Sequence, residues 1–91
     1  MSDRISLLIT EIEEFMLFSD ELSTYITLEK IAKEDQHLDR NEIHLKRIGA
    51  FRKLKDWWKN IEIKYNLSYS SEYQYEIDVV NLTVFRKRIS Q

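Results

Sequence analysis

Apolar side chains near the start of the chain recur three and four positions apart, the spacing of one face of an α-helix. They are Ile5, Leu8, Ile9, Ile12, Phe15 and Met16. Ser2 or Asp3 can cap this first helix. The same spacing continues beyond Ser19 and Asp20, as far as Ile31. We therefore predict a second helix over about residues 20–35, with a single bent helix over residues 3–35 as the alternative.

A polar connection follows, and a third helix begins near residue 40. Asp39 and Glu42 have the spacing of a capping box, in which each side chain accepts from the backbone N–H of the other residue. Leu38 and Ile43 have the spacing of a hydrophobic staple around the same start. Apolar residues then occupy one broad arc as far as Tyr65, and Asn66 is typical of a left-handed C-terminal cap. These signals predict a helix over residues 40–65.

The last third of the chain has two interpretations. Tyr73, Tyr75, Ile77 and Val79 alternate with polar residues as in a strand, and residues 61–69 alternate too. A hairpin turning at Ser70–Ser71 is one reading, although that turn lacks the Asn-Gly or Asp-Gly sequence of tight hairpins.

The other reading is a helix. Ser71 and Gln74 would form its capping box, and the acidic residues near its start and basic residues near its end suit the helix dipole. We favour this reading. The fold class expected is all-α, a small bundle of three to four helices in one domain spanning residues 1–91. The alternative is α+β, with helical N-terminal two-thirds and a C-terminal β-hairpin.

Composition supports few turns and a protein without disulfides. The 91 residues include one Gly, no Pro and no Cys. Gly and Pro are the usual residues of tight turns, so their scarcity favours long helices. No stretch has the length of a membrane span or the pattern of a secretory signal, so we expect a cytoplasmic protein without membrane contacts.

Charge is divided unevenly along the chain. Residues 1–42 carry eleven acidic and four basic side chains, whereas residues 43–91 carry five acidic and ten basic ones. The two halves therefore have net charges of −7 and +5. Either the acidic first helix packs on the basic third helix within one molecule, or an electropositive face meets an anionic partner or the acidic face of another copy.

Candidate chemistry is sparse. His37 and His44 are the only histidines, and neither lies in a metal-binding or catalytic motif. The carboxylates of the first helix have no His or nucleophile nearby in the sequence, and the lone Gly49 cannot form a phosphate-binding loop. We therefore expect no enzyme activity, no metal, no cofactor and no small-molecule substrate.

A binding role rests on the third helix. Arg47 falls on its apolar arc beside Phe51, and it requires either an internal partner such as Glu14 or an exposed setting. Trp57 and Trp58 point about 100° apart, so one of them should be partly exposed. Arg and Trp are frequent anchors of protein interfaces. These four residues predict a small protein–protein interaction module: an adaptor, an inhibitor or a self-assembling domain, of the kind that mobile elements encode.

The alternative hypothesis is a nucleic-acid-binding regulator. Its contacts would be the basic side of the third helix and the basic patch near the C-terminus, namely Arg52, Lys55, Lys59, Arg86, Lys87 and Arg88. The sequence pI of about 5.7 is well below the basic value usual for such proteins. A protein partner, or a second copy in a homodimer or higher assembly, is the favoured expectation.

Overall fold

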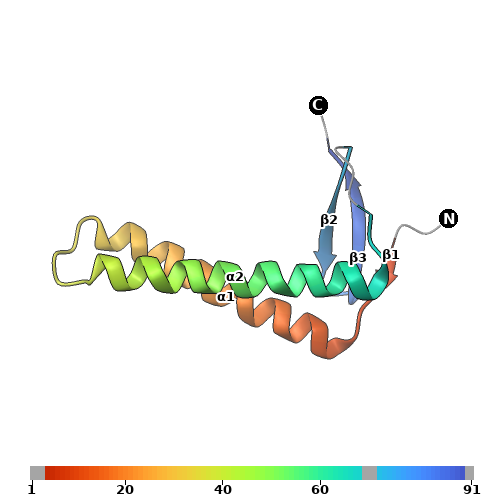
Figure 1. Ribbon diagram of the computed structural model, residues 1–91, viewed down its shortest axis with the longest axis horizontal. Coiled ribbons are helices and arrows are strands. Elements are labelled where there is room, and N and C mark those ends of the chain that lie inside the picture. The colour runs from red at the N-terminus through yellow and green to blue at the C-terminus, as the bar shows by residue number, and fades with distance from the viewer. Residues whose placement is uncertain (1–3, 69–71, 90–91) are drawn as a thin grey trace.

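A long helical hairpin carries a small antiparallel sheet at one end (Figure 1). The computed structural model describes residues 4–68 and 72–89. Its elements, in chain order, are β1 (Arg4–Ser6), α1 (Ile9–Ala32), α2 (Arg40–Tyr65), β2 (Tyr73–Asp78) and β3 (Thr83–Arg88). The all-α bundle of three to four helices is therefore wrong, and the fold belongs to the alternative α+β class.

α1 is one continuous helix over Ile9–Ala32, so the separate helix predicted over residues 20–35 is wrong and the alternative, a single helix, is correct. The polar residues in its middle do not break it, and the Thr24 and Thr27 hydroxyls donate to the carbonyls of Asp20 and Ser23, one turn earlier, at 2.9 and 3.0 Å. The helix begins at Ile9 rather than near residue 3, since the preceding residues form β1. The expected caps, Ser2 and Asp3, lie outside the described residues.

The bounds predicted for the third helix are confirmed by α2. Asp39 caps it, with its Oδ1 accepting from the Glu42 N–H at 3.1 Å. The Glu42 carboxylate instead lies 3.3 Å from the Lys46 ammonium, one turn further along. Asn66 ends the helix in the left-handed conformation, with φ 54° and ψ 50°. The next residue then donates its N–H to the Glu62 carbonyl at 2.9 Å.

Because Asn tolerates positive φ better than most residues, Asn66 contributes to stability through its backbone conformation. We expect Asn66→Ala to lower the free energy of unfolding by about 1 kcal/mol. Asn66→Gly should leave it unchanged or raise it slightly. Urea denaturation followed by circular dichroism measures both, and an alanine variant as stable as the parent would contradict this account.

The sheet has the order β1-β3-β2, with antiparallel pairing throughout. Val84 of β3 lies at its centre, opposite Ile5 of β1 and Ile77 of β2. The observed hairpin, β2–β3, differs from the hairpin that the sequence suggested as an alternative. Residues 61–65 belong to α2, and β2 pairs with β3 instead of turning back at Ser70–Ser71. Ser70 and Ser71 themselves, and so the proposed cap of a final helix, are outside the described residues.

The β2–β3 turn is built by an aspartate and not by glycine. Asp78 Oδ1 accepts from the backbone N–H groups of Val80 and Asn81, each at 3.1 Å, and the Asn81 amide donates to its Oδ2 at 2.8 Å. Led by the Asn81 side chain, these bonds hold the pKa of Asp78 below its usual value. Leu82 completes the turn at φ 52°.

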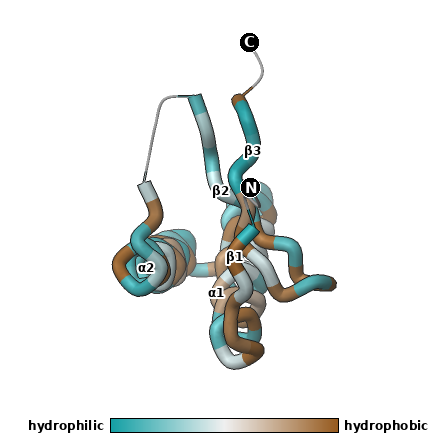
Figure 2. Tube along the Cα trace, turned by 90° about the vertical axis from the view of Figure 1, so that its right-hand side faces the viewer, coloured by the Kyte–Doolittle hydropathy of each residue, from teal (hydrophilic) through white to brown (hydrophobic). Residues whose placement is uncertain are grey.

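The core lies where the sheet meets the helices. Its buried residues come from every layer: Leu7, Ile12, Trp57, Ile61 and Val84. Seen along the helices, the strands rise above α1, with α2 beside it (Figure 2). The far end of the helical hairpin extends beyond the sheet (Figure 1), and the radius of gyration is 16.0 Å, against about 12 Å for a compact chain of this length. Helix surface at that end is therefore not covered by a second layer.

Candidate interaction surface on the second helix

A shallow groove of about 900 Å³ runs along α2 and combines apolar and basic side chains. Three apolar residues, Ile48, Phe51 and Leu54, lie along it together with Trp58. Its remaining lining is charged and consists of Arg52, Lys55, Asp56, Lys59 and Glu62. We call this surface the α2 groove.

The apolar part of the groove is unusually open to solvent. Phe51 exposes 54% of its surface and Ile48 36%. Trp58 is half-buried, with its ring centroid 6.2 Å from that of Phe15 of α1. An aromatic side chain that is mostly exposed in the interior of a helix is a common feature of interaction surfaces.

The structure separates the two tryptophans. Trp57 is 5% exposed, and its indole N–H donates to the Glu11 carbonyl of α1 at 3.0 Å. Its ring lies edge-on to that of Trp58 at a centroid distance of 5.1 Å. Of the four residues predicted to bind a partner, Phe51 and Trp58 therefore line the α2 groove, whereas Trp57 is part of the core.

Arg47 is partly exposed and pairs with α1 of the same molecule. Its Nε forms an ion pair with Glu29 Oε2, and the Glu29 Oε1 lies 2.9 Å from His44 Nδ1. The hydrogen bond with His44, followed by the charge of Arg47, holds the pKa of Glu29 below its usual value. The partner of Arg47 is thus Glu29 and not Glu14, and Arg47 is not among the residues that line the groove.

The six basic residues considered for nucleic acid do not form one surface. Arg52, Lys55 and Lys59 line the α2 groove, but the other three lie on β3, where successive side chains point to opposite faces. Arg86 stacks over the Tyr73 ring at 4.8 Å, and Lys87 lies 3.6 Å from the Glu76 carboxylate on the other face. Arg88 ends the strand and is exposed.

Part of the charge asymmetry is neutralised between the two helices. Within residues 4–68, acidic α1 is joined to basic α2 by the ion pairs Glu11–Lys64, Glu21–Lys53 and Glu29–Arg47. Among the described residues, Glu13, Glu14 and Asp20 of α1 form no ion pair, and neither do Arg52, Lys55 and Lys59 of α2. Unpaired charge of opposite sign therefore remains on the two helices.

Glu11 is the polar residue whose role the sequence conceals, because it is one of several carboxylates of the first helix and no motif distinguishes it. Its carboxylate accepts from the Tyr65 hydroxyl at 2.6 Å, the Leu8 N–H at 2.7 Å and the Lys64 ammonium at 3.1 Å. Burial raises its pKa, but these bonds outweigh burial and hold the pKa below 4.5. No local signal marks it, because Leu8, which begins the helix three residues earlier, is not a typical cap residue.

A second hollow, of about 570 Å³, lies at the end of the hairpin away from the sheet, and polar residues of both helices line most of it. It includes His44 and Glu29, which already pair with each other. Over residues 4–68 and 72–89, no three His, Cys or carboxylate side chains converge as metal ligands would. Within the same ranges, neither helix is apolar enough over a sufficient length to cross a membrane.

No protein-family model, curated protein or solved structure matches the chain.

Proposed function

We propose that the protein is a non-enzymatic, cytoplasmic interaction module whose α2 groove binds an amphipathic helix of a partner protein. The observation that carries this proposal is the exposure of Phe51, 54%, on a helix surface that also offers Ile48 and Trp58. Burying such side chains against a partner is the main favourable term in helix-in-groove recognition.

The charges around the groove favour an acidic partner. Arg52, Lys55 and Lys59 are exposed and unpaired within the described part of the chain, and they outnumber the two acidic residues of the groove. Basic residues beside an apolar strip favour a helix whose apolar positions, three and four apart, are flanked by Asp or Glu. We infer that the partner carries such a segment, as an adaptor's or inhibitor's target would.

Selection from a displayed library of helical peptides tests this function. We expect enriched peptides to combine an apolar stripe with acidic flanks, and Phe51→Ala to weaken their binding at least about tenfold, as loss of a central aromatic anchor does. Because Phe51 is more than half exposed, the same variant should unfold at nearly the parent's temperature. Fluorescence anisotropy of labelled peptides measures the affinity.

The matched control is Ile31→Ala, which removes an apolar side chain of similar exposure, 47%, near the end of α1. It should bind the selected peptides like the parent. Peptides without acidic residues, or binding that survives Phe51→Ala, would contradict the proposal. Salt-sensitive binding of nucleic acid that Arg52→Glu with Lys59→Glu abolishes would favour the alternative function instead.

A further inference from the structure

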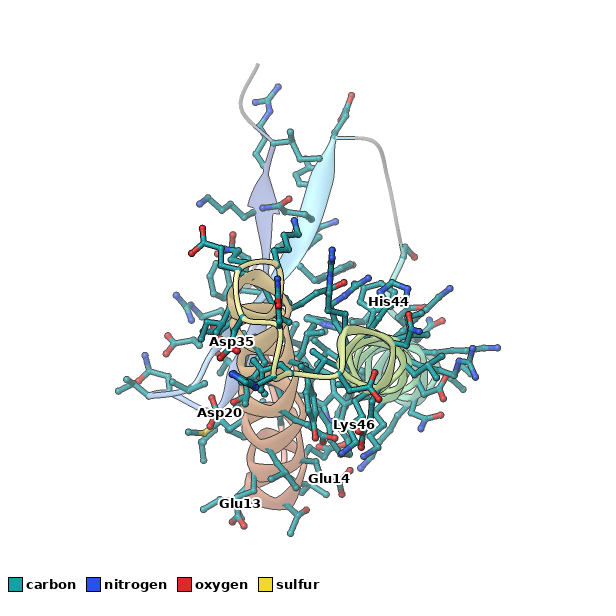
Figure 3. All side chains as sticks on the ribbon, turned by 90° about the vertical axis from the view of Figure 1, so that its left-hand side faces the viewer. Glu13, Glu14, Asp20, Asp35, His44 and Lys46 are labelled. Atoms are coloured by element: carbon teal, nitrogen blue, oxygen red, sulfur yellow. The ribbon has the colours of Figure 1, made fainter. Side chains whose placement is uncertain are left out.

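The outer side of α1, turned away from α2, is both acidic and apolar. Glu13 and Asp20 lie on it, as Figure 3 shows. Glu13 comes two positions after Glu11, and Asp20 two positions after Phe18; both Glu11 and Phe18 pack inward. Because successive helix residues are about 100° apart, two positions place a side chain on the opposite side of the helix. Exposed Ile9 and Met16 fall on this same side. We call these four residues, Ile9, Glu13, Met16 and Asp20, the α1 outer face.

The outer side of α2 has the complementary composition. Arg52 and Lys59 follow the buried residues Ala50 and Trp57 by two positions, so they point away from α1. Leu45 and Ile63, which expose 67% and 72% of their surface, lie on the same side, one at each end of the basic pair. These four residues, Leu45, Arg52, Lys59 and Ile63, form the α2 outer face. It borders the α2 groove and shares its two basic residues.

The two outer faces match in spacing. Glu13 and Asp20 are seven residues apart, as are Arg52 and Lys59, and seven residues of helix span about 10.5 Å. In an antiparallel pairing that sets Glu13 opposite Lys59, Asp20 comes opposite Arg52. The same register sets Ile9 opposite Ile63.

At the remaining positions this register creates no conflict. Thr27 of α1, which is exposed, comes opposite Leu45. Asp56, an acidic residue of α2 close to this face, comes opposite Met16, so no carboxylate faces another. A single alignment therefore satisfies both charged pairs and the apolar pair together.

We propose that the protein assembles with itself, the α1 outer face of one copy packing antiparallel on the α2 outer face of the next. The occupant is a second copy because the charges and their spacing on the two faces, and the apolar pair Ile9 with Ile63, agree in one register. This goes beyond the proposed function, since Ile9, Leu45 and Ile63 play no part in the α2 groove.

The geometry also fixes the type of assembly. The two faces lie on opposite sides of the helical hairpin, so two copies cannot satisfy both contacts with each other. Such a head-to-tail interface repeats from copy to copy, giving rings or filaments and not a closed dimer. Because exposed ion pairs are weak and screened by salt, association should be weak and salt-sensitive.

Charge exchange tests the contact by sedimentation velocity. The parent's average mass should rise with concentration beyond that of a dimer, and fall at about 1 M salt, where the Debye length is ~3 Å. Glu13→Lys with Asp20→Lys, or Arg52→Glu with Lys59→Glu, should each weaken association at least about tenfold, because like charges then face each other. All four changes in one chain should restore it, as should mixing the two double variants.

The matched control is Glu14→Lys with Glu34→Lys, which changes net charge by the same amount away from the outer face and should associate like the parent or better. A parent that stays monomeric, a dimer that does not grow, or a fourfold variant that fails to associate would overturn the proposal. Phe51→Ala separates it from the proposed function, since this variant should lose peptide binding and still assemble. If Arg52 and Lys59 instead bind nucleic acid, the fourfold variant should not regain the function that the double variant loses.

Discussion

Replacing Trp57 with alanine is expected to lower the free energy of unfolding by about 3–5 kcal/mol, the range measured for large aromatic residues in protein cores. Trp57 joins the two helices and the sheet in one core cluster and contacts the Phe15 ring at a centroid distance of 4.9 Å. Its loss also leaves the Glu11 carbonyl without the indole donor at 3.0 Å. A domain of this size is stable by only about 5–15 kcal/mol, so the effect should be large.

Urea denaturation monitored by circular dichroism measures this loss. Trp58→Ala is the matched control, since it removes the same side chain one position along, where the ring is only half-buried. Trp58→Ala should lower the free energy of unfolding by clearly less than Trp57→Ala. If Trp57→Ala does not fold, Trp57→Phe keeps most of the ring and loses the indole donor, and we expect a cost of about 1–2 kcal/mol. Equal destabilisation by the two alanine variants would contradict the assignment of Trp57 to the core.

Glu11→Ala is expected to be the second most destabilising change, by about 2–3 kcal/mol. The carboxylate is 14% exposed and ties the start of α1 to the end of α2 through Tyr65 and Lys64. Hydrogen bonds to a charged group contribute about 1.5–3 kcal/mol, although the exposed Lys64 adds little. Glu14→Ala, one turn later and without an ion pair in the described structure, should change stability by less than about 0.5 kcal/mol.

The contribution of Glu11 should also depend on pH in a defined direction. Its pKa is held below 4.5 in the folded state, so the native protein binds the proton less readily than the unfolded chain. The stabilisation is therefore present in full at pH values well above the usual pKa of a glutamate, and is lost as the pH falls through the lowered pKa. The difference in stability between the parent and Glu11→Gln should shrink over that window. A difference that stays constant down to strongly acidic pH would show that the charge of Glu11 is not responsible.

Where the sequence was informative, short-range interactions set the structure. The bounds of α2 follow from Asp39, which caps its start within three residues, and from Asn66, which ends it through its own backbone conformation. The apolar spacing of α1 likewise identified a helix, although not where it begins. These signals act between residues one or two turns apart, so they can be read without knowledge of the fold.

The structure of the two ends of the chain was predicted wrongly, because β1 near the N-terminus forms only by pairing with β3 near the C-terminus. Ile5 fits a helical stripe and a strand equally well, and only pairing with Val84, far along the chain, makes it a strand. The β2–β3 turn carries no glycine, and it depends on Asp78 bonding to the backbone two and three residues ahead. Without those contacts, the local pattern favoured a final helix, and the alternative hairpin turning at Ser70–Ser71 was also not the observed one.

The sequence by itself determined that residues 40–65 form a basic helix between its own caps, and that an acidic helical region precedes it after a polar connection. It did not determine that the earlier region is one helix, or that β2 and β3 form where a final helix was favoured. Only the tertiary structure decided that Trp57 and not Trp58 is buried, that Arg47 pairs with Glu29, and that Glu11 is a junction between the helices. The physical reason is the distance along the chain over which each interaction acts. Helix periodicity and caps are local, whereas burial and ion pairing depend on which side of each helix the other helix and the sheet cover.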